Sequence, residues 1–257
     1  MFKKTIAYVI LLIMALSLFT LSACNKNEFE FELISTGTAY RVTGYTGIKR
    51  DIIIPGFHKG KPVTEIGGSG GFYYSQDIES VEIPADVQCI NEAAFTSCRS
   101  LRAVTFASGS QLKIIDDVAF SYCDKLKSIE IPASVISIGE IAFDNCHDLE
   151  SVTFESGSQL KIIGRQAFGV CSSLKSIVIP ASVTSFSGDS TLFNNVNLES
   201  VFFAGSQIES LGSQPFHSCP NLANIYFGGT EEQWNIINTE DANINASIVV
   251  HFNWAGG

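Results

Sequence analysis

The sequence predicts a solenoid of stacked repeats, built mainly of short parallel β-strands that are joined by turns and short helical segments. Phenylalanine recurs every 23 or 25 residues, and cysteine follows most of these phenylalanines three positions later. An alternating apolar triplet, such as Ile-Glu-Ile or Val-Thr-Phe, then completes each copy. A unit of this length cannot bury its apolar residues alone, so neighbouring copies must stack them into one continuous core.

The recurring phenylalanines define the copies and their register. They are Phe72, Phe95, Phe120, Phe143, Phe168, Phe193 and Phe216, with spacings of 23, 25, 23, 25, 25 and 23 residues. At the cysteine position the exceptions are Ser75 and Val196. Copies that continue with Ile-Pro-Ala alternate with copies that continue with Phe-Ala-Ser-Gly or Phe-Glu-Ser-Gly, whose turn is two residues longer. This difference explains the alternating spacing and indicates a duplicated two-copy unit.

The residue order within a copy is typical of leucine-rich repeats, which place Leu-x-x-Ile-x-Ile beside a Cys or Asn at a period in the low twenties. The stretch from Cys123 to Phe143 resembles the BspA-like, Treponema-type class of this family, and the resemblance covers about residues 52–230. It implies a curved leucine-rich-repeat solenoid, with the repeat array at 51–230. Because the relatives are associated with surface adhesion and host-protein binding, it also implies a binding protein rather than an enzyme.

Both ends of the predicted array carry caps. Phe29–Leu33 and Tyr40–Thr43 alternate as two strands of an N-terminal β-hairpin cap, and an insertion at 56–62 interrupts a degenerate first copy. Residues 231–257 predict a C-terminal helix–strand cap, with Thr230 as N-cap and Gln233 completing a capping box. We expect the last copy to be covered by Trp234, Ile236 and Ile237, and a closing strand at 248–252.

The first 23 residues predict a lipoprotein signal peptide. Lys3 and Lys4 precede an uncharged apolar run, which ends in Leu21-Ser22-Ala23-Cys24. This sequence resembles a lipobox, which implies that Cys24 carries a lipid and that residues 24–50 form the lipidated N-terminus, a tether and the hairpin cap. The alternative is an ordinary secretory signal that is cut after Ala23. The lipid would hold the protein outside the cytoplasm, on the cell membrane or outer membrane of a bacterium.

The charge balance excludes two classes of partner. The chain has 16 basic and 26 acidic residues, so removal of two lysines with the signal peptide leaves 14 − 26 = −12. Nucleic acids and anionic membrane surfaces require clustered Lys and Arg. We therefore expect no nucleic-acid partner and membrane contact through the Cys24 lipid alone.

The cysteines and histidines predict no metal, cofactor or catalytic site. No Cys-x-x-Cys pair, His-Glu-x-x-His motif or phosphate loop occurs. Cys98, Cys123, Cys146 and Cys171 fall once per copy, which favours buried thiols over redox or metal chemistry. Cys89 lies in a turn, where we expect partial exposure. The pattern predicts that His58 lies in a solvated loop of the insertion and that His147 and His217 are surface side chains.

The candidate binding residues are Val178, Phe202 and Tyr226. They are middle residues of successive triplets, which should point away from the core. The same position holds Glu or Thr in the earlier copies, so the surface changes from polar to apolar and aromatic along the array. An exposed apolar patch often marks a binding site. The alternative is that the C-terminal cap shields these residues.

The predicted function is a surface-anchored binding or adhesion module, without catalysis, for a protein or glycan at the cell surface. One alternative is a structural scaffold of the cell envelope that has no soluble ligand. The other is a hydrolase of surface polymers, which would require carboxylates or a nucleophile–base pair in one cleft.

Overall fold

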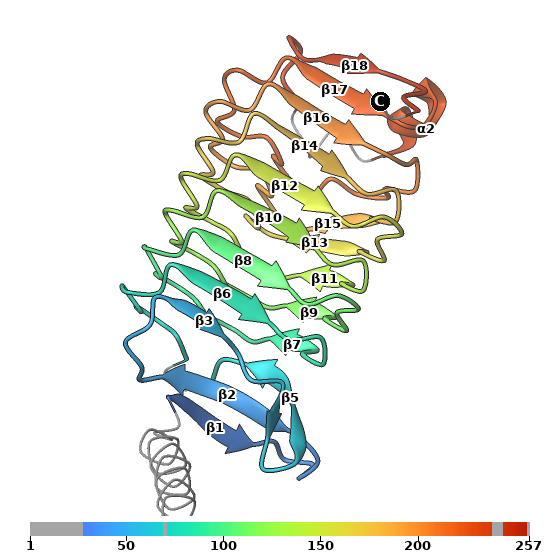
Figure 1. Cartoon of the computed structure of the whole chain (residues 1–257). Coiled ribbons are helices and arrows are strands. Elements are labelled where there is room, and N and C mark those ends of the chain that lie inside the picture. Colours follow the sequence, from blue (N-terminus) through green and yellow to red (C-terminus); the bar gives the residue numbers. More distant parts are fainter. Residues whose placement is uncertain (1–27, 69–70, 238–243, 256–257) are drawn as a thin grey trace, which may run out of the picture.

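The computed structural model describes residues 28–68, 71–237 and 244–255, drawn in colour in Figure 1. The predicted signal peptide and the predicted lipid attachment site, Cys24, lie outside these residues. The described chain forms a solenoid whose short strands lie above one another along its length (Figure 1). The predicted fold class is confirmed.

The N-terminal cap is an antiparallel hairpin of β1 (Phe29–Leu33) and β2 (Tyr40–Tyr45). β2 pairs in parallel with β5 (Lys61–Ile66), which joins the hairpin to the array. The insertion forms a second hairpin, because β4 (Phe57–His58) pairs antiparallel with β5. The prediction of a solvated loop at His58 is wrong, because its ring stacks on Phe31 at 3.8 Å between ring centroids and meets the edge of Tyr40 at 4.7 Å.

Two rows of strands run along the array. The front strands are β3 (Asp51–Ile53), β6 (Ser80–Ile83), β8 (Ala103–Phe106), β10 (Ser128–Ile131), β12 (Ser151–Phe154), β14 (Ser176–Ile179), β16 (Ser200–Phe203), β17 (Asn224–Phe227) and β18 (Val249–His251). The back strands are β5, β7 (Cys89–Ile90), β9 (Ile114–Ile115), β11 (Ser137–Ile138), β13 (Ile162–Gly164) and β15 (Ser185–Ser187). The back strands form one sheet with β1, β2 and β4, whereas the front strands form two sheets, β3 to β12 and β14 to β18.

The core between the two rows is a continuous aromatic and aliphatic stack. The rings of Phe72, Phe95, Phe120, Phe143 and Phe168 follow one another at centroid distances of 4.9, 5.2, 5.2 and 5.3 Å. All five side chains are fully buried. The spacing is close to the separation of hydrogen-bonded strands, about 4.8 Å, because each ring belongs to one copy.

The turns that carry these rings add a third column of backbone hydrogen bonds. The amide N–H of Phe95 donates to the carbonyl of Ala119 at 2.8 Å, and Phe120 donates in the same way to Ala142. Alanine fits before the ring because its side chain is also fully buried between copies. These bonds satisfy backbone groups that a buried turn would otherwise leave unpaired.

One copy departs from the predicted register. Leu192, and not Phe193, takes the core position, since it is fully buried and its carbonyl accepts from the Cys219 thiol at 3.1 Å. Asn195, and not Val196, takes the cysteine position, with its side-chain amide donating to the Phe168 carbonyl at 2.8 Å. The predicted register is therefore wrong by one residue in this copy.

The C-terminal cap is the helix α2 (Glu231–Ile236) followed by β18. The expected capping box is present, since the Thr230 hydroxyl accepts from the Gln233 amide and the Gln233 side chain accepts from the Thr230 amide. Trp234 and Ile237 are buried as expected, but Ile236 is 82% exposed, so its predicted covering role is wrong. No helix within the described residues is long and apolar enough to cross a membrane.

Candidate functional site

The outer surface of the front strands carries the residues that the sequence singled out. Burial alternates along each strand: in β14, Ile177 and Ile179 are buried, whereas Ser176 and Val178 are exposed. The middle residues therefore form an outward row, which we call the front column. It consists of Ile53 of β3, Glu82, Thr105, Glu130, Thr153, Val178, Phe202, Tyr226 and, by the pairing of β17 with β18, His251.

The last three members form an aromatic stack, which we call the aromatic end: Phe202, Tyr226 and His251. Phe202 and Tyr226 lie 4.6 Å apart between ring centroids with planes 9° apart, and Tyr226 and His251 lie 4.5 Å apart with planes 12° apart. The Nε2 atom of His251 lies 2.9 Å from Oδ1 of Asn224, which holds the imidazole in the stack. All three rings are half-buried.

The C-terminal cap covers the aromatic end in part. Trp254 packs on Phe202 at 5.1 Å, tilted by 45°. The cap helix lies elsewhere, because Trp234 contacts the inward rings of Phe203 and Phe227. Val178, the next member of the front column, remains 45% exposed. The structure thus brings the three candidate residues into one row, with partial cover at Phe202.

Sequence reasoning missed His251 and Trp254. A signal for His251 was present, because it follows Tyr226 by 25 residues, which is one repeat length. The intervening helix interrupts the repeat pattern and concealed this register. Nothing in the local sequence indicated that Trp254 would turn back onto Phe202.

The cysteines lie in the core and at its edge. The thiols of Cys98, Cys123, Cys146 and Cys171 are buried and donate to the carbonyls of Phe72, Phe95, Phe120 and Phe143. Burial raises the pKa of the Cys98 thiol to about 12 and also raises the pKa of the other three. A raised pKa suppresses the reactive thiolate, which is consistent with a packing role. Cys89 is half-buried, as expected, but it lies in strand β7 and not in a turn.

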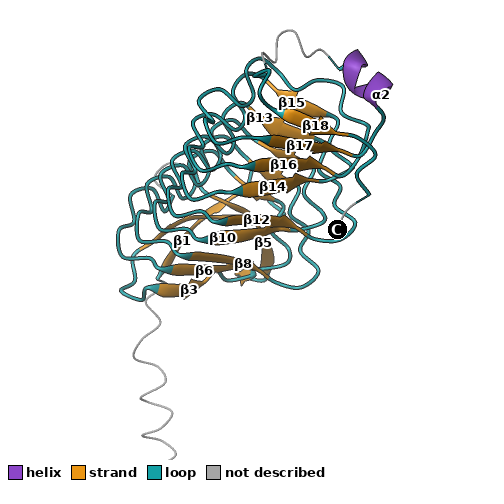
Figure 2. Ribbon diagram, turned by 90° about the horizontal axis from the view of Figure 1, so that it is seen from above, coloured by secondary structure: helices purple, strands orange, loops and turns teal. Residues whose placement is uncertain are grey.

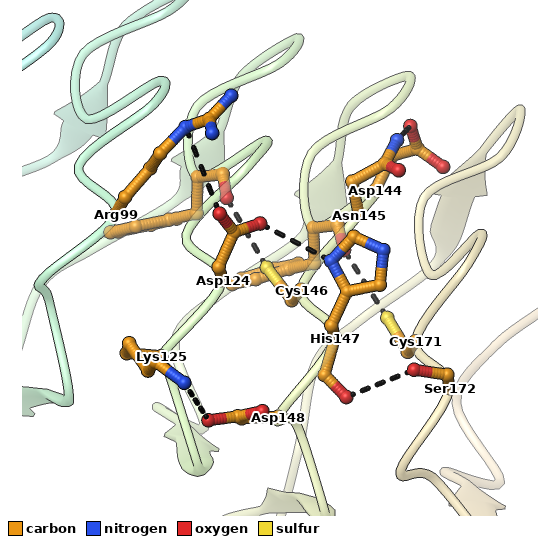
Figure 3. A network of polar contacts seen from close by, with 12 residues as sticks. Arg99, Asp124, Lys125, Asp144, Asn145, Cys146, His147, Asp148, Cys171 and Ser172 are labelled. Carbon is orange, nitrogen blue, oxygen red and sulfur yellow. Dashed lines mark hydrogen bonds and ion pairs between the residues drawn. The ribbon is translucent and has the colours of Figure 1, made fainter.

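A polar row lies on the turns beside the cysteines (Figure 3). His147 Nδ1 is 3.2 Å from Asp124 Oδ1, and Arg99 Nε is 3.7 Å from Asp124 Oδ2. The hydroxyl of Ser172 donates to the backbone carbonyl of His147 at 3.3 Å and not to its ring. The Asp–His–Ser sequence of this row therefore lacks the hydroxyl–imidazole hydrogen bond that activates a serine nucleophile.

Asp144 lies next to this row. Burial raises the pKa of its carboxyl to about 6, although the Asn145 side chain donates a hydrogen bond to it. Within residues 28–68, 71–237 and 244–255, no three His, Cys, Asp or Glu side chains form a group that could hold a metal ion.

Comparison with known proteins identifies the family. The sequence pattern described as "BspA type Leucine rich repeat region (6 copies)" matches residues 64–190 and 156–241, which together span more than half of the chain. The chain belongs to the BspA-type leucine-rich-repeat family. No curated protein matches this BspA-type chain.

Two solved structures have the same fold as this BspA-type solenoid. The Treponema pallidum leucine-rich-repeat protein TpLRR is 19% identical with a TM-score of 0.58, and the match covers 88% of this chain and 99% of TpLRR. The pneumococcal vaccine antigen PcpA is 18% identical with a TM-score of 0.54, and the match covers 89% of this chain and 93% of the PcpA structure.

Proposed function

We propose that this BspA-type chain is a binding or adhesion module for a protein partner, held on the outer side of a bacterial membrane by a lipid on Cys24. The observation that carries the proposal is the change along the front column after Ile53, from exposed Glu and Thr side chains to Val178 and the aromatic end. Aromatic side chains supply large contact areas at interfaces. A repeat array presents such residues as one extended surface.

The stacking geometry favours a protein over a glycan. Sugar rings pack on the open faces of aromatic side chains, but Phe202, Tyr226 and His251 turn their faces toward one another within 12° of parallel. Their edges are what a partner can reach, and Trp254 contacts Phe202 in a tilted arrangement. Tilted and edge contacts are typical of aromatic and aliphatic side chains in protein interfaces.

Binding is tested by screening the full chain against purified matrix proteins and against proteins of a bacterial envelope extract. The double variant Phe202→Ala/Tyr226→Ala should weaken binding at least about tenfold, because interface aromatics commonly contribute more than 1.4 kcal/mol each. The matched control is Glu82→Ala/Thr105→Ala, which changes the polar half of the same column. Equal binding by the double variant and the wild type would refute the proposed surface.

The lipid anchor rests on the sequence around Cys24, and it has a separate test. Bacteria that express the chain should incorporate labelled fatty acid into it, and Cys24→Ala should abolish the label and release the protein from the membrane fraction. Cys89→Ala is the control, since Cys89 belongs to the array. Labelling that persists in Cys24→Ala would contradict the anchor.

A further inference from the structure

The front surface is split between two copies. β12 and β14 are the facing edge strands of two separate front sheets, whereas β13 and β15, the back strands of the same copies, remain paired. Seen in Figure 2, β12 and β14 follow one another in the front row without belonging to one sheet. Their facing backbone groups therefore lack the ladder hydrogen bonds that the other front strands share.

Proline contributes to this split. The residue after a front strand normally donates to the preceding copy: Glu155 N–H to the Ile131 carbonyl at 3.0 Å, and Ala204 N–H to the Ile179 carbonyl at 2.9 Å. After β14 the residue is Pro180, which has no N–H. After β10 it is Pro132, and there the pairing of β8 with β10 is reduced to one residue pair.

A cleft of about 420 Å³ lies at the split. Its walls include Thr153, Phe154 and Glu155 from the β12 copy and Val178, Pro180 and Ser182 from the β14 copy. The cleft is mainly apolar, and it contains Val178, the exposed front-column residue next to the aromatic end.

One hydroxyl in the wall is left without a partner among the described residues. Ser182 Oγ is buried and makes no hydrogen bond there. In an earlier Ile-Pro-Ala-Ser copy the equivalent Ser134 donates to the Leu112 carbonyl at 2.8 Å. A buried hydroxyl without a partner costs free energy, so the β14 side of the split is less well satisfied than the equivalent place in the earlier copy.

We propose that this cleft takes an apolar side chain from an extended segment of a basic protein partner, which lies across the outer surface of β12 and β14. Alternate side chains of an extended peptide point to the same side, so one apolar side chain can enter the cleft while the backbone stays on the surface. This inference rests on the proposed binding function and places its main anchor at the cleft.

Charge selects a basic segment. Glu155 is the charged residue of the cleft wall, and one of its oxygens already accepts from the Ala133 N–H at 2.9 Å. The chain as a whole has a net charge of −10. A Lys or Arg beside the apolar anchor would pair with Glu155 and be attracted by the surrounding field.

The cleft also continues a surface that already accepts an aromatic side chain. Trp254 occupies the position over Phe202, one strand beyond Val178. The partner's apolar side chain would take the next position along the same row, between Thr153 and Val178.

A random linear peptide library, selected on the full chain, supplies the probe for the test. Recovered peptides should combine an aromatic or aliphatic residue with a neighbouring Lys or Arg. Thr153→Trp, which fills the cleft, should weaken their binding at least about tenfold. Thr105→Trp is the matched control, because Thr105 holds the same place in the preceding two-copy unit, and it should bind like the wild type. Glu155→Gln should weaken binding and reduce its salt dependence.

A second measurement is independent of these substitutions. Bound peptide should slow hydrogen exchange at the amides of β12 and β14, and leave exchange in β6 and β8 unchanged. Full binding by Thr153→Trp together with loss in Phe202→Ala/Tyr226→Ala would overturn the cleft and leave the proposed function standing. Full peptide binding by both variants, or failure to recover any peptide, would overturn the proposed cleft. If the double variant also still binds matrix protein, the proposed binding surface of the aromatic end is overturned as well.

Discussion

Leu192 and Phe193 are adjacent, and they test the register of the array directly. Leu192 is fully buried, whereas Phe193 is half-buried and stacks on His217 at 5.6 Å between ring centroids. Leu192→Ala removes core methyl groups and leaves a cavity, so it should lower the free energy of unfolding by about 2–5 kcal/mol. Phe193→Ala removes one aromatic contact of about 0.5–1.5 kcal/mol and little fully buried area, so the loss should be close to 1 kcal/mol.

The assay is urea unfolding of both variants and the wild type, followed by circular dichroism and by tryptophan fluorescence. Repeat arrays can unfold in stages, so the two probes must give coincident transitions before the free energies are compared. The sequence spacing alone predicts the opposite order, because it places Phe193 in the core. A larger loss for Phe193→Ala than for Leu192→Ala would refute the register described here.

Three further outcomes follow from the buried polar groups and the cap. Burial raises the carboxyl pKa of Asp144 from 3.8 to about 6, so this group should make the wild type less stable as the pH rises from about 4 to about 6; relative to the wild type, Asp144→Asn should therefore be more stable at pH 7 than at pH 4, and unfolding of both proteins at the two pH values would contradict this if the difference did not change. In the native protein at pH 8, iodoacetamide should modify the buried thiols far more slowly than after unfolding, and mass spectrometry of the peptides that contain Cys98, Cys123, Cys146 and Cys171 would reveal early modification if this is wrong. Thr230→Ala removes the capping box of α2 and should cost about 0.5–2 kcal/mol in urea unfolding, whereas Ile236→Ala, at an exposed position of the same helix, should cost a few tenths; equal losses would contradict the cap.

The sequence predicts the fold because each copy repeats the same core pattern. Phe120, Cys123 and the alternating triplet at 129–131 lie where their spacing places them, and the capping box at Thr230 lies at the start of α2. The prediction fails at Leu192, because the neighbouring Phe193 fits the phenylalanine spacing and is mistaken for the core residue. Asn195 was the available signal, because Asn and Cys both occupy that position in leucine-rich repeats.

The candidate site is less predictable, since it depends on contacts between distant segments. The outward row of Val178, Phe202 and Tyr226 follows from strand alternation. The cover by Trp254 does not, because it depends on how the last residues turn after β18. The stacking of His58 on Phe31 has the same cause, since two hairpins far from each other in sequence pack their rings together.

The split in the front sheet depends on two features together: a longer Ser-Gly turn in one copy and an Ile-Pro sequence in the next. Proline alone does not open the sheet: Pro84 follows β6, yet β3 and β6 keep three residue pairs and the Ile54 N–H still reaches the Glu82 carbonyl. A copy that ends in phenylalanine does not open it either, because β16 and β17 pair along their length and the Gly228 N–H reaches the Phe203 carbonyl.

Pairing is reduced or lost where a copy with the longer Ser-Gly turn is followed by an Ile-Pro copy, as at β8 with β10 and at β12 with β14. The first of these junctions lies between Thr105 and Glu130 of the front column, which are polar and exposed. The second lies between Thr153 and Val178, next to the aromatic end. The opening therefore recurs once in each two-copy unit. At the second opening the front column supplies Val178, which makes that opening the more apolar of the two and the one proposed to hold a partner's side chain.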